Sequence, residues 1–172
     1  CEENRESYGT KGAQKSGRLA AGLYDDRTHF IFELLQNAED ALGRRGQWHG
    51  SRKVEFALNA TRLTLSHFGK PFDEADVRSV CDIAESTKNE SSIGRFGLGF
   101  KSVYTVTDLP EIHSGDEDFA IENYVFPKRS ERSVRAADET QIILPLKPGD
   151  ASAAHDITTG FRHLGPGALL FL

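Results

Sequence analysis

Residues 28–42 read THFIFELLQNAEDAL, and this stretch decides the fold because its apolar residues recur with the period of an α-helix. The apolar stripe consists of Phe30, Ile31, Leu34, Leu35, Ala38, Ala41 and Leu42. Asp25, Asp26 and Thr28 offer N-cap oxygens, and Gly43 or Gly46 can end the helix. The sequence therefore predicts one amphipathic helix whose apolar side covers a core.

The polar side of the same helix carries a second pattern. Glu33, Asn37 and Asp40 are spaced by four and three residues, so they share one face away from the apolar stripe. A carboxylate one turn from a carboxamide suits a hydrated cation, because the amide offers a neutral oxygen and the acid can deprotonate a water. A solvated helix face gives the same spacing, so this pattern alone leaves both interpretations open.

Outward from the helix, the pattern changes to short strands. Two alternating segments at 54–58 and 63–65, joined by a turn at 59–61, predict a hairpin. Asp73 can cap a second helix, and a third helical stretch is expected from Phe100 to about Thr105. Further strands are expected around Ile112, at 119–126 and at 140–146, with a charged loop at 127–139. This order predicts an α+β domain, one sheet with helices on one face.

A glycine-rich loop, Gly94-Arg95-Phe96-Gly97-Leu98-Gly99, opens the third helical stretch. Closely spaced glycines let backbone N–H groups approach an anion, and a helix N-terminus adds a favourable dipole. Arg95 and Lys101 could add positive charge beside phosphates. The loop lacks the Gly-Lys-Ser/Thr of a Walker loop, and the segment before it is polar rather than a buried strand.

Composition excludes several classes of protein. The chain has 172 residues, a net charge of -5 and 27% charged residues, which describe one globular domain and not a disordered chain. No apolar run could span a membrane, and the acidic balance does not indicate nucleic acid as a partner. Two cysteines cannot form a disulfide framework, so we expect a cytoplasmic protein, or a nuclear one if eukaryotic. His67 apart, the histidines are expected at the surface.

Two separated motifs together carry a family resemblance. ELLQNAEDA (33–41) resembles the N-box of the GHKL superfamily, and GRFGLGFKSVY (94–104) resembles its glycine box. With FGKPFDEADV and STK between them, they most resemble the sacsin and No-vein type of Hsp-like ATPase domain, over about 23–146. The resemblance implies a Bergerat fold, a two-layer sandwich in which helices cover one face of a mixed β-sheet around an ATP site.

The resemblance also implies roles for individual residues. Glu33 would be the general base that activates the attacking water, Asn37 would hold Mg2+, and Asp40 would lie near the nucleotide. The phosphates would be wrapped by Gly94, Arg95, Phe96, Gly97, Leu98, Gly99, Phe100 and Lys101. Thr87 and Lys88 would lie in a lid segment, where Lys88 could reach a phosphate, and Thr140 would lie on the adenine side.

The chain departs from the superfamily at the box that reads adenine. Where the superfamily has Asp-x-Gly-x-Gly, the matching positions read His67-Phe68-Gly69-Lys70-Pro71. The missing Asp would accept a hydrogen bond from the adenine amino group. Neutral His67 has one acceptor nitrogen and could take over that role, with a different pH dependence. Adenine selectivity therefore stays open at this stage.

Two functions remain. The first is Mg2+-dependent ATP binding with slow hydrolysis to ADP and phosphate, gating a conformational change of a larger protein. The second is a nucleotide-sensing interaction module that binds ATP but hardly hydrolyses it. A histidine kinase is disfavoured, since no helix with a phospho-acceptor His precedes the N-box. The expected partners are ATP and ADP, the rest of the polypeptide and a second copy in an ATP-dependent homodimer. We expect a lead-in at 1–20, the ATP-binding domain at 21–150 and a following segment from 151 to 172.

Overall fold

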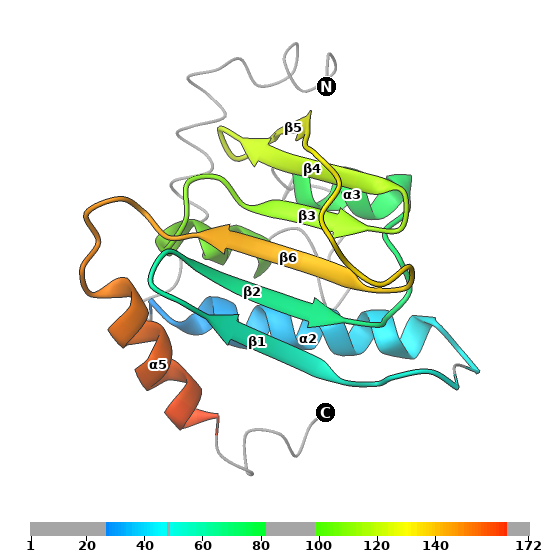
Figure 1. Ribbon diagram of the computed structural model, residues 1–172, viewed down its shortest axis with the longest axis horizontal. Helices are drawn as coiled ribbons and strands as arrows, with labels where there is room; N and C mark the ends of the chain where they lie inside the picture. The colour runs from blue at the N-terminus through cyan, green and yellow to red at the C-terminus, as the bar shows by residue number, and fades with distance from the viewer. Residues whose placement is uncertain (1–26, 48, 82–98, 165–172) are drawn as a thin grey trace, which may run out of the picture.

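The computed structural model describes residues 27–47, 49–81 and 99–164, which form a layer of helices against one sheet (Figure 1). The elements in chain order are α2 (His29–Arg44), β1 (Val54–Leu58), β2 (Arg62–His67), α3 (Glu74–Cys81), the 3-10 helix η1 (Lys101–Thr105), β3 (Glu111–Ser114), β4 (Glu117–Glu122), β5 (Phe126–Arg129), β6 (Thr140–Pro145) and α5 (Ala153–His163). This is the α+β class predicted from the sequence.

The sheet has six strands in the order β1-β2-β6-β3-β4-β5, and every neighbouring pair is antiparallel. The expectation of a mixed sheet was therefore wrong. The chain from β2 to β3 crosses the helical layer through α3 and η1, which makes these two strands parallel to each other. They do not pair, because β6 inserts between them and runs opposite to both.

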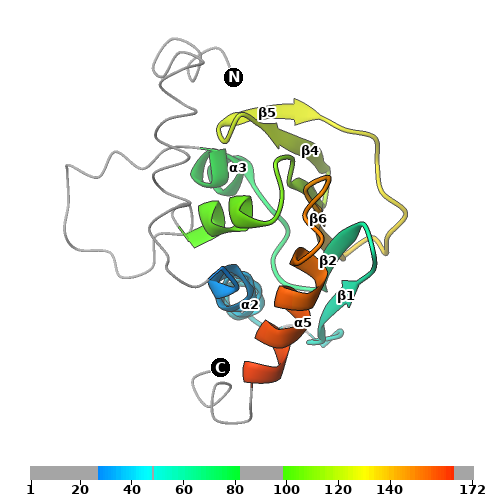
Figure 2. The same ribbon diagram turned by 90° about the vertical axis from the view of Figure 1, so that its left-hand side faces the viewer.

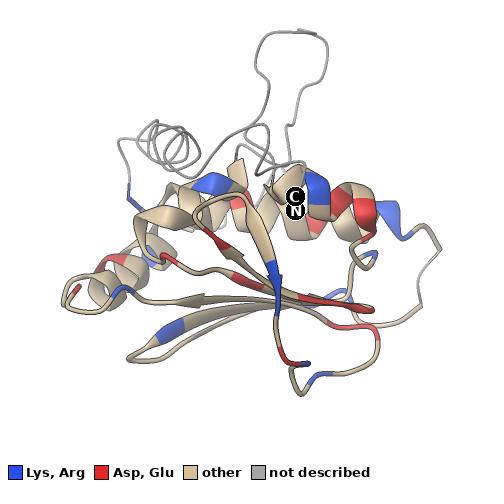
Figure 3. Cartoon of the chain, turned by 90° about the horizontal axis from the view of Figure 1, so that it is seen from above, with Lys and Arg blue, Asp and Glu red and all other residues tan. Residues whose placement is uncertain are grey.

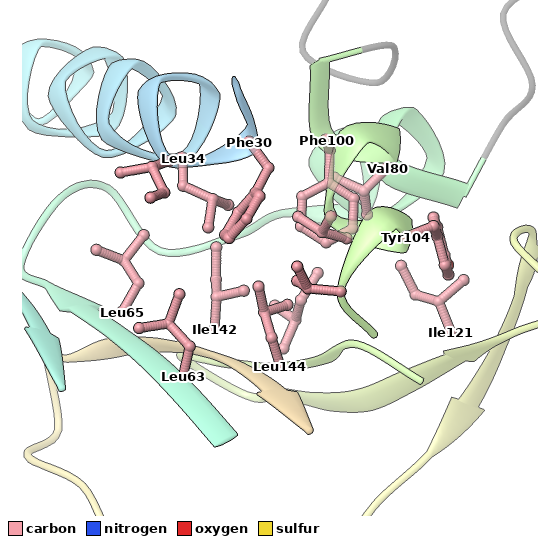
Figure 4. Packing of buried hydrophobic residues seen from close by; sticks show 14 of the residues in the cluster. Phe30, Leu34, Leu63, Leu65, Val80, Phe100, Tyr104, Ile121, Ile142 and Leu144 are labelled. Atoms are coloured by element: carbon pink, nitrogen blue, oxygen red, sulfur yellow. The ribbon is translucent and has the colours of Figure 1, made fainter. Parts of the chain in front are cut away.

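The helices lie on one side of the sheet (Figures 2 and 3). Figure 3 also shows Lys and Arg scattered among Asp and Glu over helices, strands and loops. The core fills the space between the layers: Phe30 and Leu34 of α2 point toward Leu63 and Leu65 of β2 (Figure 4). All four side chains are at most 1% exposed. Burying side chains of this size supplies most of the stability of such a domain, at about 1.5–3 kcal/mol each.

Most of the local predictions hold. Asn59 Oδ1 accepts the N–H groups of Thr61 and Arg62 at 2.9 and 3.0 Å, which closes the β1–β2 hairpin. Asp73 Oδ1 accepts the N–H of Asp76 at 3.0 Å, while Asp76 Oδ2 accepts the N–H of Asp73 at 3.1 Å, so α3 begins with a reciprocal cap. At the start of α2, Thr28 is the N-cap residue, but its side chain makes no capping hydrogen bond.

The strand predicted at 119–126 is divided by a turn. Asn123 and Tyr124 adopt positive φ angles of 49° and 73°, which reverse the chain between β4 and β5. The first residues of the loop expected at 127–139 consequently belong to β5. Periodicity alone does not show this reversal, because neither residue is the glycine that usually marks a left-handed position.

The helix α5 lies in the part of the chain where a following segment was expected. Its Ala153 and Ile157 are fully buried, and the ring of Phe161 lies 5.1 Å from that of Phe56 in β1. The Arg27 guanidinium contacts the carboxylates of Asp150 and Asp156, the latter at 2.8 Å. These contacts join α5 to the start of α2 and to the edge of the sheet.

Candidate functional site

The polar side of α2 approaches the backbone at Gly99, two residues before η1, through Glu33. A Cβ atom placed on Gly99 would lie 2.7 Å from Glu33 Cδ and closer still to Oε2. Such a distance is shorter than any van der Waals contact, so only a glycine at position 99 lets the backbone approach the carboxylate without moving it. The two motifs that the sequence singled out, 33–41 and 94–104, therefore touch at these two residues.

His29 holds the other oxygen of the same carboxylate. His29 Nε2 lies 2.9 Å from Glu33 Oε1, one helical turn away, and the two side chains are 35% and 24% exposed. The sequence prediction placed His29 among surface histidines and missed this contact. The spacing of four residues on a helix could have revealed it.

Asn37 lies one turn further along α2 and is 8% exposed. Its Nδ2 atom is buried and has no hydrogen-bond partner among the residues that the structure describes. Buried amides in proteins are almost always paired, so an unpaired one needs an explanation. Asp40, which the sequence placed on the same face, is exposed to solvent. Of these three polar residues, Asn37 is thus buried, Glu33 partly buried and Asp40 exposed.

Lys101 does not extend toward a phosphate site. It is 1% exposed, and its Nζ donates to the backbone carbonyl oxygen of Val80 at 2.6 Å and to that of Tyr124. The expectation that Lys101 adds charge at phosphates is therefore corrected. Its ammonium group instead donates hydrogen bonds to carbonyl oxygens at the end of α3 and in the β4–β5 turn. These buried acceptors need such a donor.

His67 and Gly69, which were predicted to read the base, lie at the C-terminal end of β2 and just after it. His67 is 2% exposed and shares a strand face with Leu63 and Leu65, the face that carries the core. Burial lowers the pKa of His67 to about 4, because the charged form loses hydration. His67 Nδ1 accepts the N–H of Gly69 at 3.1 Å. The single acceptor of neutral His67 is thus already used, which corrects the expectation that it could accept from an adenine amino group.

The loop after His67 is fixed against α2. A Cβ atom on Gly69 would lie 2.5 Å from Ala41 Cβ, and the N–H of Lys70 donates to Ala41 O at 2.7 Å. Arg45 Nη1 donates to the carbonyl oxygens of Phe68 and Gly69 at 2.9 and 3.0 Å. The Phe68 carbonyl and the Gly69 N–H belong to one planar peptide group, so the contact of Arg45 with Phe68 O constrains the direction of that N–H.

Thr140 lies beside His67 on the neighbouring strand. The two residues are directly paired in the β2–β6 register, and Thr140 is fully buried. Thr140 Oγ1 is 2.5 Å from Ser114 Oγ, which also accepts the N–H of Phe72 at 3.0 Å. We call His29, Glu33, Asn37 and Gly99 the Glu33 cluster, and Arg45, His67, Gly69 and Thr140 the His67 cluster.

The structure thus brings most of the predicted site residues that it describes to α2 or to the neighbouring strand ends. Phe100 is 1% exposed and packs in the core beside Val80 (Figure 4). The other predicted residues lie outside the described residues: Thr87, Lys88, Gly94, Arg95, Phe96, Gly97 and Leu98. Among the described residues, no three His, Cys, Asp or Glu side chains gather to hold a metal ion.

One other histidine differs from its prediction. His113 on β3 is 2% exposed, and its Nδ1 lies 2.8 Å from Asp118 Oδ1 on β4. Arg135 Nη1 donates to the same oxygen at 2.7 Å and attaches the loop before β6 to the β3–β4 hairpin. The partner of this histidine lies on the neighbouring strand, which the spacing of histidines in the sequence does not reveal.

Comparisons with known proteins agree with the geometry. The family model described as "Sacsin domain" matches residues 21–123. The chain is 32% identical, over 90% of its length, to Protein NO VEIN of Arabidopsis thaliana, and 30% identical, over 66%, to human Sacsin. It is 27% identical, over 64%, to the chaperone protein HtpG of Aliarcobacter butzleri. The chain spans 6%, 3% and 22% of these three relatives. In the described ranges, every helix is too short or too polar to span a bilayer.

Proposed function

The chain belongs to the sacsin domain family, with the sacsin and No-vein type of Hsp-like GHKL domain, and from this premise we propose that it binds ATP with Mg2+ and hydrolyses it slowly. The observation that carries this proposal is the close approach of Gly99 to the Glu33 carboxylate. It brings the last glycine of the sequence 94–99 against an acid, which supports a general base beside bound phosphates.

The residues of the Glu33 cluster fit a magnesium ion. Mg2+ takes oxygen ligands in octahedral geometry, keeps several waters and is commonly held by one protein oxygen together with substrate phosphates. The Asn37 amide is buried with an unpaired Nδ2, and turning the amide by half a rotation exchanges its nitrogen for its oxygen. Asn37 would hold the ion, whose chemistry is to neutralise the charge that develops on the phosphates.

Hydrolysis then depends on what the chain's own residues do. Glu33 accepts a proton from the water that attacks the γ-phosphorus, and the bond from that phosphorus to the bridging oxygen breaks to leave ADP and phosphate. His29 orients the Glu33 carboxylate through the 2.9 Å contact with Oε1. Gly99 leaves Oε2 unobstructed by a side chain. Correct placement of the base is worth a large share of the rate, since phosphoryl transfer is catalysed mainly by positioning and electrostatics.

We assign the nucleoside end of the ligand to the His67 cluster and the phosphate end to the Glu33 cluster with residues 94–100. Thr87 and Lys88 belong to the same proposal as parts of a lid, and Asp40 as a neighbour of the nucleotide on α2. The Hsp-type relatives support nucleotide binding in general. We further propose that residues 21–150 form the nucleotide-binding unit and that turnover gates a larger cytoplasmic or nuclear protein through its remaining chain or a second copy.

A single substitution tests the catalytic role. Glu33→Ala should lower the rate of phosphate release by roughly 10²–10⁴-fold, because general-base catalysis is lost, while MgATP still binds. Glu39→Ala is the matched control, an acid on the same helix outside the cluster. Calorimetry measures binding, and a phosphate-release assay measures turnover. Equal turnover in Glu33→Ala and the parent would contradict this role for Glu33. MgATP binding without phosphate release in the parent would favour the nucleotide-sensing module.

A further inference from the structure

The hydrogen bond inside the loop after β2 decides which nitrogen of His67 carries the proton. Gly69 N–H donates to His67 Nδ1 at 3.1 Å, so Nδ1 must hold a lone pair. Burial lowers the pKa of this imidazole to about 4, which keeps the ring neutral near pH 7. A neutral imidazole with an unprotonated Nδ1 has its proton on Nε2. His67 therefore presents a hydrogen-bond donor.

This tautomer is held by a rigid frame. The peptide that carries the Gly69 N–H is fixed from two directions, by Ala41 packed against the Gly69 Cα and by Arg45, which donates to the Phe68 carbonyl oxygen of that same peptide. Because the Gly69 N–H cannot turn away, the opposite tautomer would place two protons against each other at 3.1 Å. The cost of such a contact makes the Nε2–H form the stable one.

The donor on Nε2 is not used inside the described part of the chain. His67 is 2% exposed, and the one hydrogen bond of its ring there is the one with Gly69. A donor that no atom of the described residues accepts is available to a ligand. Thr140, paired with His67 across β2 and β6, adds a second polar group on the same side of the sheet.

We propose that His67 lets this site take 6-oxopurine nucleotides, such as GTP and ITP, at least as tightly as ATP. The inference rests on the proposed function, because it assumes that His67 faces the base. Adenine carries an amino donor at its 6-position, and a donor facing a donor leaves both unpaired. Guanine and hypoxanthine carry a carbonyl oxygen there, which accepts the Nε2 proton. A site that hydrogen-bonds one group rejects an analogue that lacks it.

The test compares dissociation constants for MgATP, MgGTP and MgITP, measured by calorimetry on the protein and two variants. In the parent, MgGTP and MgITP should bind at least as tightly as MgATP. His67→Asp replaces the donor by an acceptor and should shift the ratio of ATP to GTP affinity toward ATP by about tenfold. His155→Asp, on the exposed side of α5, is the matched control and should leave the ratio unchanged.

The outcomes separate the inference from the proposed function. Preference for MgATP by tenfold or more in the parent, with no change in His67→Asp, overturns the inference and leaves nucleotide binding intact. Absence of binding by all three nucleotides overturns both. NMR of the ¹⁵N-labelled parent adds a measurement that needs no variant: a proton on Nε2 and none on Nδ1 supports the inference, and the reverse overturns it.

Discussion

The two polar clusters beside α2 are built in opposite ways. In the Glu33 cluster, the carboxylate is a quarter exposed and the Asn37 amide nitrogen is buried without a partner. In the His67 cluster, the loop atoms are paired with one another: Gly69 N–H with His67, the Phe68 and Gly69 carbonyl groups with Arg45, and Thr140 with Ser114. Among the described residues, the Glu33 cluster thus keeps a polar atom without a hydrogen-bond partner, whereas almost all polar atoms of the His67 cluster have one.

This difference separates groups that serve the fold from groups that cost it stability. A buried amide without a partner destabilises the folded state by about 1–3 kcal/mol, so a structure that keeps one has another use for it. A fully paired loop stabilises the fold and fixes the direction of each remaining donor. We therefore expect substitutions in the Glu33 cluster to change turnover more than stability, and those in the His67 cluster to change stability as well.

The largest effect is expected from Gly99→Ala. The added methyl group would displace the Glu33 carboxylate, and a shift of about 1 Å in a catalytic group can cost roughly 10²-fold in rate. The fold should survive, because the nearest atoms belong to the end of a flexible side chain. Gly43→Ala is the control, since nothing lies within 4 Å of a Cβ there. Phosphate release and thermal unfolding measure both effects, and a fully active Gly99→Ala variant would contradict the assignment.

The next effect is the pH dependence of stability through His67. Its pKa is about 4 in the folded state and 6.5 for an unperturbed imidazole in the unfolded chain, so between these values the unfolded chain binds a proton that the folded chain does not. Stability is complete above pH 6.5 and falls as the pH drops, by about 3 kcal/mol at pH 4.

Urea unfolding of the parent and of His67→Asn across this range isolates the contribution of His67. In His67→Asn, the free energy of unfolding should no longer show the pH dependence that His67 contributes, whereas His155→Asn should keep it. Identical pH profiles for the parent and His67→Asn would show that His67 is not buried in the neutral form.

Lys101→Met tests the corrected role of this lysine. Loss of its ammonium group leaves the carbonyl groups of Val80 and Tyr124 without that donor, and the relief of burying a charge offsets part of the cost. We expect a net destabilisation of about 2 kcal/mol. Lys128→Met, at an exposed ion pair with Glu122, should cost much less, because solvent screens that pair. Thermal unfolding measures the stability of both variants. Equal stability of Lys101→Met and Lys128→Met would refute the structural role of Lys101.

The smallest effect on stability, with a clear effect on binding, is expected from Asn37→Ala. The substitution removes the cost of an unpaired buried donor but also the packing of the side chain, and because the two effects offset each other the free energy of unfolding should change by less than about 1 kcal/mol. Affinity for MgATP should fall by at least about tenfold, because the metal loses its protein ligand. Gln36→Ala, an exposed neighbour, is the control. Unchanged MgATP affinity in Asn37→Ala would remove Asn37 from the proposed site.

The sequence predicted the elements whose information is local. The helix at 29–44 follows from its apolar stripe, the hairpin from alternation around Asn59, and the cap of α3 from Asp73. The positions of Glu33 and Asn37 on one helix face follow from the same period. Sequence reasoning did not separate Asp40, which is exposed, from Asn37, which is buried, because exposure depends on what covers each position.

By itself, then, the sequence determined the α+β class, the family resemblance and which residues of α2 face away from the core. Only the tertiary structure decided that β6 separates β2 from β3, that Gly99 touches Glu33, that Lys101 serves the fold and that Gly69 fixes the tautomer of His67. The physical reason is the range of the interactions. Helical period and caps act within a few residues, whereas strand order, burial and hydrogen-bond partners join segments that are far apart in the chain.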